Sequence, residues 1–197
     1  MDGIKWAAFL VLGIFFLGGC TSHNIPIAIP GLSVKSDSRV KFKTISVYDL
    51  TDLDSDREYS FFDVWRAPLK EAPPFARIVS DDISAFFSRS GESQYGLKVQ
   101  IHHAQPYRTV TGLQRIPVLS LFAPAGKTTE YGVYMRILFE VLRDGKVIKT
   151  YTYYDTIKTV TQNDAGNDLE KAYKKLVAAY RQEFFQQLDR EFVAKYF

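Results

Sequence analysis

An acidic segment carries the most ligand-like spacing in this sequence. Asp52, Asp54 and Asp56 are spaced like the first, third and fifth ligands of a calcium-binding loop. Asp63 falls at the twelfth position, although it is shorter than the glutamate that usually binds there. The sixth position is Arg57, where such loops need glycine to turn. A solvated acidic turn is therefore the favoured interpretation, and calcium binding stays open as the weaker one.

No other group of side chains assembles into a catalytic or metal site. His102 and His103 are adjacent, and neighbours on a strand point to opposite faces, so they cannot share a metal without a bulge. Asp81 and Asp82 would diverge by about 100° on a helix, which does not provide the carboxylate pair of a glycan hydrolase. We therefore predict no catalytic residue, no metal and no enzymatic activity.

The composition excludes several classes of protein. The chain has 197 residues, 46% of them hydrophobic and 15% aromatic, which indicates one folded domain and not a disordered chain. A net charge of +3 is too small to predict a nucleic-acid partner. The single cysteine, Cys20, excludes an intramolecular disulfide and a cysteine-rich zinc site.

Cys20 follows a short hydrophobic segment. Apolar residues run from Trp6 to Leu17, about 12 residues, or ~18 Å as a helix. A membrane span needs ~30 Å, so the segment predicts a signal peptide over residues 1–19.

The residues Leu17-Gly18-Gly19-Cys20 resemble the lipobox of bacterial lipoproteins. The resemblance implies cleavage before Cys20, a diacylglycerol on its sulfur and an acyl chain on its new amine. No other cofactor is expected. Several acyl chains, at ~0.8 kcal/mol per buried CH₂, would anchor the protein firmly to a membrane. Thr21 stands where aspartate would retain such a protein at the inner membrane, which implies an outer-membrane location facing the periplasm.

The mature chain divides into a tether and one domain. Residues 20–38 contain prolines, Gly31 and several serines without a helical period, which predicts the lipidated cysteine and a flexible tether. Residues 39–197 then form a single periplasmic domain. Val40–Leu50 and Tyr59–Trp65 are strand-like, and Leu97–Ile101 alternates between apolar and polar residues as a half-buried strand does.

Two segments have helical periodicity. Apolar residues from Phe75 to Phe87 fall on one face and predict a helix over about 74–90, with Gly91 as its stop. A second helix is predicted over about 168–195, begun by a capping box at 167–170. Its opposite side is polar and is expected to face solvent; the residues are Lys174, Lys175, Arg181, Gln182 and Arg190.

A hairpin over 132–158 is the clearest element. Asp144-Gly145 is a strong signal for a two-residue type I′ turn. Counting from this turn, Leu142 faces Val147, Val141 faces Ile148 and Glu140 faces Lys149, so that opposite charges meet. We therefore predict an α+β domain in the order β-α-β-β-β-α, with two amphipathic helices packed on one face of a small, mainly antiparallel sheet.

Tyrosines gather on this hairpin and form the candidate interaction surface, which consists of Tyr131, Tyr134, Tyr151 and Tyr153. In the predicted register Tyr151 and Tyr153 share a face with Glu140, and Tyr154 lies on the other. Core packing is the alternative for each ring, whereas an exposed tyrosine-rich face is typical of recognition surfaces.

The chain resembles the ABC-type transport auxiliary lipoproteins in three features. These are the Pro73-Pro74 entry to the first helix, the Asp144-Gly145 hairpin and the final helix. The similarity covers roughly residues 40–192 in element order, and the 106–130 segment is longer than that family suggests. It implies a non-enzymatic accessory or assembly subunit of an envelope transport complex, with envelope proteins as partners or as a homo-oligomer. The alternative is a carrier that binds lipid or another apolar ligand between helices and sheet. No residue-level site carries over.

Overall fold

Three long strands form the centre of the structure, a computed structural model that describes residues 27–33, 40–51, 65–69, 73–110, 128–162 and 168–197. These strands are β5 (Tyr95–Val110), β6 (Thr128–Arg143) and β7 (Lys146–Gln162), and each pairs antiparallel with the next. The shorter strands are β1 (Lys41–Phe42), β2 (Thr44–Asp49), β3 (Trp65–Pro68) and β4 (Ser88–Arg89). The helices are α2 (Phe75–Phe86) and α4 (Asp168–Leu188), the latter continued by the π-helical η3 (Asp189–Val193) and α5 (Ala194–Tyr196).

The main sheet has five strands and mixed direction. Its order is β2-β5-β6-β7, and β3 also pairs with β5. β2 runs parallel to the first part of β5, whereas β3 runs antiparallel to its last part. β1 and β4 form a separate parallel pair. This arrangement confirms the α+β class and the mainly antiparallel sheet.

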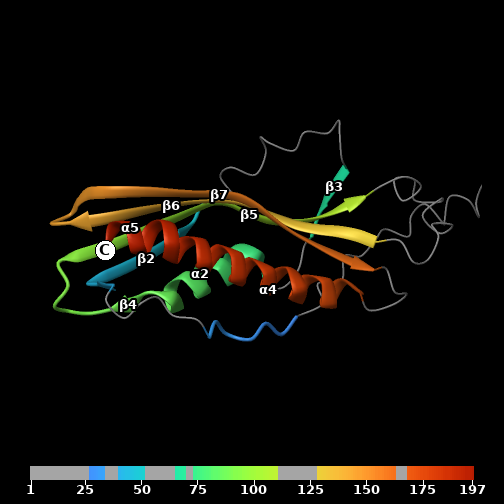
Figure 1. The fold of residues 1–197 in the computed structure, drawn as a ribbon, viewed down its shortest axis with the longest axis horizontal. Helices are drawn as coiled ribbons and strands as arrows, with labels where there is room; N and C mark the ends of the chain where they lie inside the picture. The colour runs from blue at the N-terminus through green and yellow to red at the C-terminus, as the bar shows by residue number, and fades with distance from the viewer. Residues whose placement is uncertain (1–26, 34–39, 52–64, 70–72, 111–127, 163–167) are drawn as a thin grey trace, which may run out of the picture.

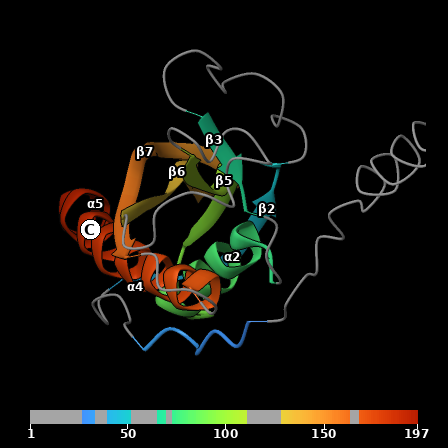
Figure 2. The ribbon, with the colours of Figure 1, turned by 90° about the vertical axis from the view of Figure 1, so that its right-hand side faces the viewer.

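The molecule is layered, as Figures 1 and 2 show. Helices α2 and α4 lie side by side against one face of the sheet, as predicted. Alternate residues of β6 point toward them and are fully or almost fully buried; these are Val133, Met135, Ile137, Phe139 and Val141. Residues 27–33 cross the helices on the side away from the sheet.

The first helix is shorter than predicted. It ends at Phe86, and Phe87 is already extended, with a ψ of 142°. The chain then forms β4 and pairs with β1, so Gly91 is not the helix stop. The reason is tertiary, because Phe87 turns into the core against Phe42, with ring centroids 5.4 Å apart.

Strand β5 is longer than predicted and continues through Pro106. The Pro106 carbonyl accepts a hydrogen bond of 2.9 Å from the Leu69 amide. Since the nitrogen and carbonyl of one strand residue face the same edge, the missing N–H of Pro106 points away from β6. The proline therefore removes no bond to β6, and it lies where the opposite edge of β5 passes from β2 to β3.

Candidate functional site

The hairpin turn forms as predicted, but the strand that follows shifts by one residue. Asp144 and Gly145 have φ values of 52° and 75°, as a type I′ turn requires. Leu142 faces Val147 as predicted. Ile148 is then bulged out of the ladder, so that Val141 faces Lys149 and Glu140 faces Thr150. The predicted pairing of Glu140 with Lys149 is therefore wrong.

The bulge decides which tyrosines face the core. Because side chains alternate along a strand, a shift of one residue moves each of them to the other face. Tyr151 now faces Phe139 and Tyr153 faces Ile137, both on the helix side of the sheet. Their predicted place beside Glu140 is therefore wrong.

The four tyrosines of the predicted surface do not share one face. Tyr131 and Tyr153 are buried, Tyr151 is half-buried beneath the C-terminal helical segment, and Tyr134 lies on the opposite face. The Tyr151 hydroxyl lies 3.1 Å from Glu191 Oε2 and donates to it. Burial, followed by the neighbouring Glu191, raises the pKa of Tyr151 well above its usual value, so this phenol stays protonated.

The face of the sheet away from the helices carries a different group of side chains, which we call the sheet patch: His103, Tyr134, Arg136 and Tyr154. His103 on β5, Arg136 on β6 and Tyr154 on β7 stand in one row across three strands. Tyr134 contacts both rings, with its centroid 5.4 Å from that of His103 and 5.2 Å from that of Tyr154. Tyr154 is 64% exposed, the largest value among the exposed large hydrophobic residues of the described chain.

Arg136 carries the positive charge at the centre of this patch. Lys98 pairs with Glu140 on one side of it, at 2.8 Å, and Lys158 pairs with Glu130 on the other, at 3.3 Å. Arg136 is exposed and forms no ion pair within the described part of the chain. Among the described residues, the patch therefore presents a guanidinium that has no ion-pair partner and lies between aromatic rings.

Glu140 is held by its own sheet neighbours. Gln100 Nε2 donates to Glu140 Oε2 at 2.9 Å, and the Lys98 ammonium contacts the same oxygen. The hydrogen bond from Lys98 is the main reason that the pKa of Glu140 lies below its usual value. This carboxylate thus has its partners within the sheet and forms no ion pair with Arg136.

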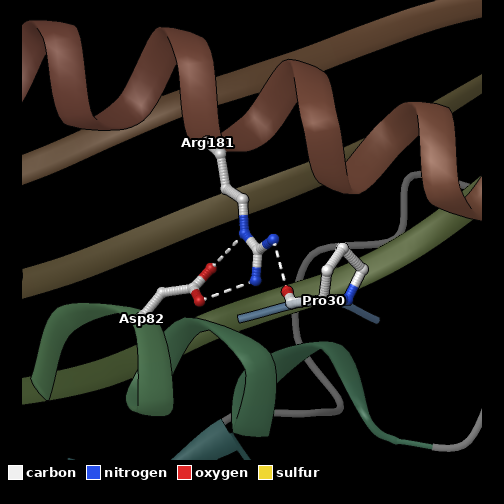
Figure 3. Close-up of polar contacts among 3 residues, drawn as sticks. All are labelled: Pro30, Asp82 and Arg181. Carbon is white, nitrogen blue, oxygen red and sulfur yellow. Dashed lines mark hydrogen bonds and ion pairs between the residues drawn. The ribbon is translucent and has the colours of Figure 1, made fainter. Parts of the chain in front are cut away.

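A second polar cluster, the helix clamp, lies on the helical side and consists of Asp82, Arg181 and the Pro30 carbonyl (Figure 3). Arg181 Nε donates to Asp82 Oδ2 and Arg181 Nη2 donates to Asp82 Oδ1, each at 2.8 Å. The pair is therefore bidentate. Arg181 Nη1 donates to the Pro30 oxygen at 2.7 Å. The Asp82 and Arg181 side chains are only 4% and 16% exposed. Burial raises the pKa of Asp82 above its usual value, because desolvation outweighs the attraction of Arg181.

The clamp corrects the expectation that Arg181 faces solvent. Sequence reasoning missed both partners, although a signal was present. Asp82 stands one helical turn from Ile78 and from Phe86, both of which are buried, so it lies within the apolar stripe of α2. A carboxylate in such a stripe needs a cationic partner from another element.

Several predicted sites lie outside the described residues. These are Cys20, the Asp52, Asp54 and Asp56 loop, and the capping residue Asn167. His102 is bulged between Ile101 and His103, which is the irregularity that a shared metal would need. Even so, the described residues contain no group of three or more His, Cys, Asp or Glu side chains able to hold a metal. They also contain no helix that is long and apolar enough to span a membrane.

Comparison with known family models and with curated proteins gave no match. A solved structure that the chain resembles is that of a Xanthomonas campestris protein of the family DUF330. The two chains are 11% identical, the alignment covers 87% of this chain and 99% of the other, and the TM-score is 0.42. We draw no functional conclusion from a likeness at this level. The fold itself defines a layered α+β domain with helices on one face of the sheet and an exposed aromatic and cationic patch on the other.

Proposed function

We propose that this protein is a non-enzymatic accessory subunit of a bacterial envelope complex, anchored to the outer membrane through Cys20 and facing the periplasm. Its domain binds a partner protein through the sheet patch. The observation that carries this proposal is the row of His103, Arg136 and Tyr154 across three strands, in which His103 is half-buried and the other two are exposed, with Tyr134 beside it. An envelope transport complex, as the family resemblance implies, is the assembly that we propose it serves.

The chemistry of the patch favours a protein carboxylate as its ligand. Tyrosine and arginine are the residue types that most often dominate protein interfaces. Arg136 offers a planar fork that matches a carboxylate, and the flanking rings offer apolar area to the side chains around it. An aspartate or glutamate beside an apolar residue on the partner would satisfy both.

The same charge disfavours direct pairing of two copies through this patch. In a symmetric dimer whose two-fold axis passed through the centre of this patch, residues near the axis would meet their own counterparts, so two Arg136 guanidinium groups would approach one another. We therefore propose a different envelope protein as the partner. A homo-oligomer would have to use another surface.

The carrier hypothesis finds no supporting observation in the described residues. The space between the helices and the sheet is filled with aromatic rings: Phe184 lies 4.7 Å from Tyr153, and Phe192 lies 5.4 Å from Phe139, between centroids. All four side chains are fully buried. A ligand in this layer would have to displace them.

A photo-crosslinking residue at position 154 tests the partner in intact cells. We expect it to give a discrete adduct whose other component, identified by mass spectrometry, is an envelope protein. A crosslinker at Lys174, which is exposed on α4, is the matched control and should not give this adduct. The substitution Arg136→Glu should remove the adduct at position 154 by charge repulsion. Recovery of monomer alone, or of the same adduct from both positions, would argue against the proposed site.

The anchor has its own test. Cys20→Ser should abolish incorporation of labelled palmitate. Undiminished labelling of the substituted protein would contradict lipid anchoring through Cys20.

A further inference from the structure

Residues 27–33, which we call the strap, belong to the packed structure of the domain. Ile27 is only 4% exposed and lies in the hydrophobic core, and Ile29 and Leu32 pack against that core while half-buried. Between them, Ala28 and Pro30 are exposed. This alternation of inward and outward residues is the pattern of a docked segment and not of a free tether. The expected tether over residues 20–38 therefore contains a docked stretch.

The helix clamp holds the strap at its centre. The two bonds to Asp82 orient the guanidinium of Arg181, so that its remaining nitrogen is aimed at the Pro30 carbonyl (Figure 3). A donor that is already oriented loses little entropy when it accepts a new partner. One arginine thus joins α2, α4 and the strap.

We propose that the strap fixes the side from which the membrane anchor leaves the domain, and so directs the sheet patch away from the anchoring membrane. This inference rests on the proposed lipidation of Cys20. The strap lies on the outer side of the helices, whereas the sheet patch lies beyond them on the opposite face of the sheet (Figures 1 and 2).

The strap also shortens the reach of the anchor. From Cys20 to Ile27 the chain advances about seven residues, which span at most ~25 Å when fully extended. If the strap were undocked, about 20 residues would separate Cys20 from Val40, and they could span ~70 Å. A docked strap therefore holds the helical side near the membrane and leaves the patch accessible to a partner in the periplasm.

Docking is tested by the reactivity of introduced thiols in the full, membrane-extracted chain. Ile27→Cys and Ala28→Cys are neighbours in the strap, one buried and one exposed. We expect the thiol at position 27 to react with a maleimide about tenfold or more slowly than the thiol at position 28. Leu32→Cys and Ser33→Cys form a second pair. We expect the thiol at the half-buried position 32 to react more slowly than the thiol at the exposed position 33, with a smaller ratio between the two rates. Equal rates within both pairs would overturn the docking of the strap.

Arg181→Lys tests whether the clamp is what holds the strap. It keeps a positive charge beside Asp82 but lacks the fork that reaches Pro30 as well. We expect the ratio between positions 27 and 28 to fall toward one while circular dichroism shows an intact fold. An unchanged ratio would remove Arg181 from the proposal.

Lipidation is read separately in the same experiment. Cys20 is the only natural cysteine, so an acylated wild-type chain should not react with maleimide. Reaction of the wild-type chain would refute the proposed anchor, while the ratios between neighbouring thiols would still report on the strap.

Orientation is tested with the lipidated protein in vesicles of phosphatidylethanolamine and phosphatidylglycerol that contain an acceptor-labelled lipid. A donor dye is attached at Ala178→Cys, on the exposed side of α4 one turn before Arg181, or at Thr152→Cys, on the exposed sheet face. We expect stronger energy transfer from position 178 than from position 152. Equal or reversed transfer would overturn the proposed orientation.

Discussion

At the scale of single residues, the helix clamp shows how a buried charge is tolerated in a small domain. Asp82 is buried among apolar side chains of α2, and Arg181 meets both of its oxygens. A bidentate pair of this kind contributes little net stability compared with apolar residues, but breaking it leaves an uncompensated charge. Our hypothesis is that the pair specifies how α2 and α4 are placed more than it stabilises the fold.

Arg181→Met should lower the free energy of unfolding by about 3 kcal/mol at pH 7, because it leaves the Asp82 carboxylate buried without its cation. Denaturant unfolding measures this loss. The double variant Asp82→Leu with Arg181→Met should recover most of it, since no buried charge remains. A double variant as unstable as the single one would show that the pair itself stabilises the fold.

The same single variant should regain stability in acid. Burial raises the pKa of Asp82 even in the presence of Arg181, and the loss of the cation raises it further. A carboxyl whose pKa is higher in the folded state destabilises the fold when it ionises, so its cost disappears as the pH falls through that pKa. The loss in the free energy of unfolding that Arg181→Met causes should therefore be smaller at pH 4.5 than at pH 7. A deficit that does not depend on pH would contradict this assignment.

Two buried tyrosines provide a matched test of hydrogen bonding. The Tyr173 hydroxyl donates to the Pro73 carbonyl at 3.0 Å, whereas the Tyr180 hydroxyl is buried and finds no partner in the described structure. Tyr173→Phe should lower the free energy of unfolding by about 1 kcal/mol. Tyr180→Phe should leave it unchanged or raise it by up to about 1 kcal/mol, since it removes a buried group without a bond. If both substitutions destabilise equally, Tyr180 has a partner in solution.

At the scale of elements, the β6–β7 hairpin depends on its turn and on its bulge. The turn brings the strands together, and the bulge at Ile148 then decides which face each later residue of β7 takes. Without the bulge, Tyr151 and Tyr153 would leave the core and Tyr154 would enter it. The place of Tyr154 in the sheet patch therefore depends on Ile148, six positions earlier in β7.

Gly145→Ala should lower the free energy of unfolding by about 1 kcal/mol, because φ at this position is 75° and a side chain is strained there. Asp144→Asn is the control and should be nearly neutral, since asparagine tolerates positive φ. Thermal unfolding of both variants checks this. A neutral Gly145→Ala would mean that the turn adapts to another conformation.

At the scale of the whole molecule, the order of the layers is strap, helices and sheet (Figure 2). The strap closes the outer side of the helical layer, where Ile27 completes the core. For the lipid anchor and the partner proposed above, this order separates the anchored side of the molecule from the side that carries the sheet patch. The proposed membrane attachment and the proposed partner binding are then compatible with each other.

Removal of residues 27–33 should therefore destabilise the domain, whereas removal of residues 21–26 should not. Loss of Ile27 alone exposes apolar surface worth roughly 2 kcal/mol, and Ile29 and Leu32 add to this. The two deletions are compared by denaturant unfolding in a Cys20→Ser background, where the chain carries no lipid. Equal midpoints would show that the strap contributes nothing to the fold.

Local patterns in the sequence were sufficient for most of the elements. Period-two and helical patterns located the long strands and both helices, and Asp144-Gly145 located the turn, because each of these signals lies within a few neighbouring residues. The helix clamp was only partly accessible in this way. Asp82 in an apolar stripe signals that a partner exists, but it does not identify that partner as Arg181, 99 positions away along the chain.

The sequence by itself therefore determined the class of the fold, the hairpin turn and the lipobox-like segment at Cys20. Only the tertiary structure decided which face Tyr151, Tyr153 and Tyr154 take, because the bulge at Ile148 leaves no periodic mark and reverses the faces of β7. Tertiary contacts also decided that the strap is docked, since its bond comes from a guanidinium on α4 to a backbone carbonyl. A carbonyl is present in every residue, so no sequence pattern can reveal which one will be used.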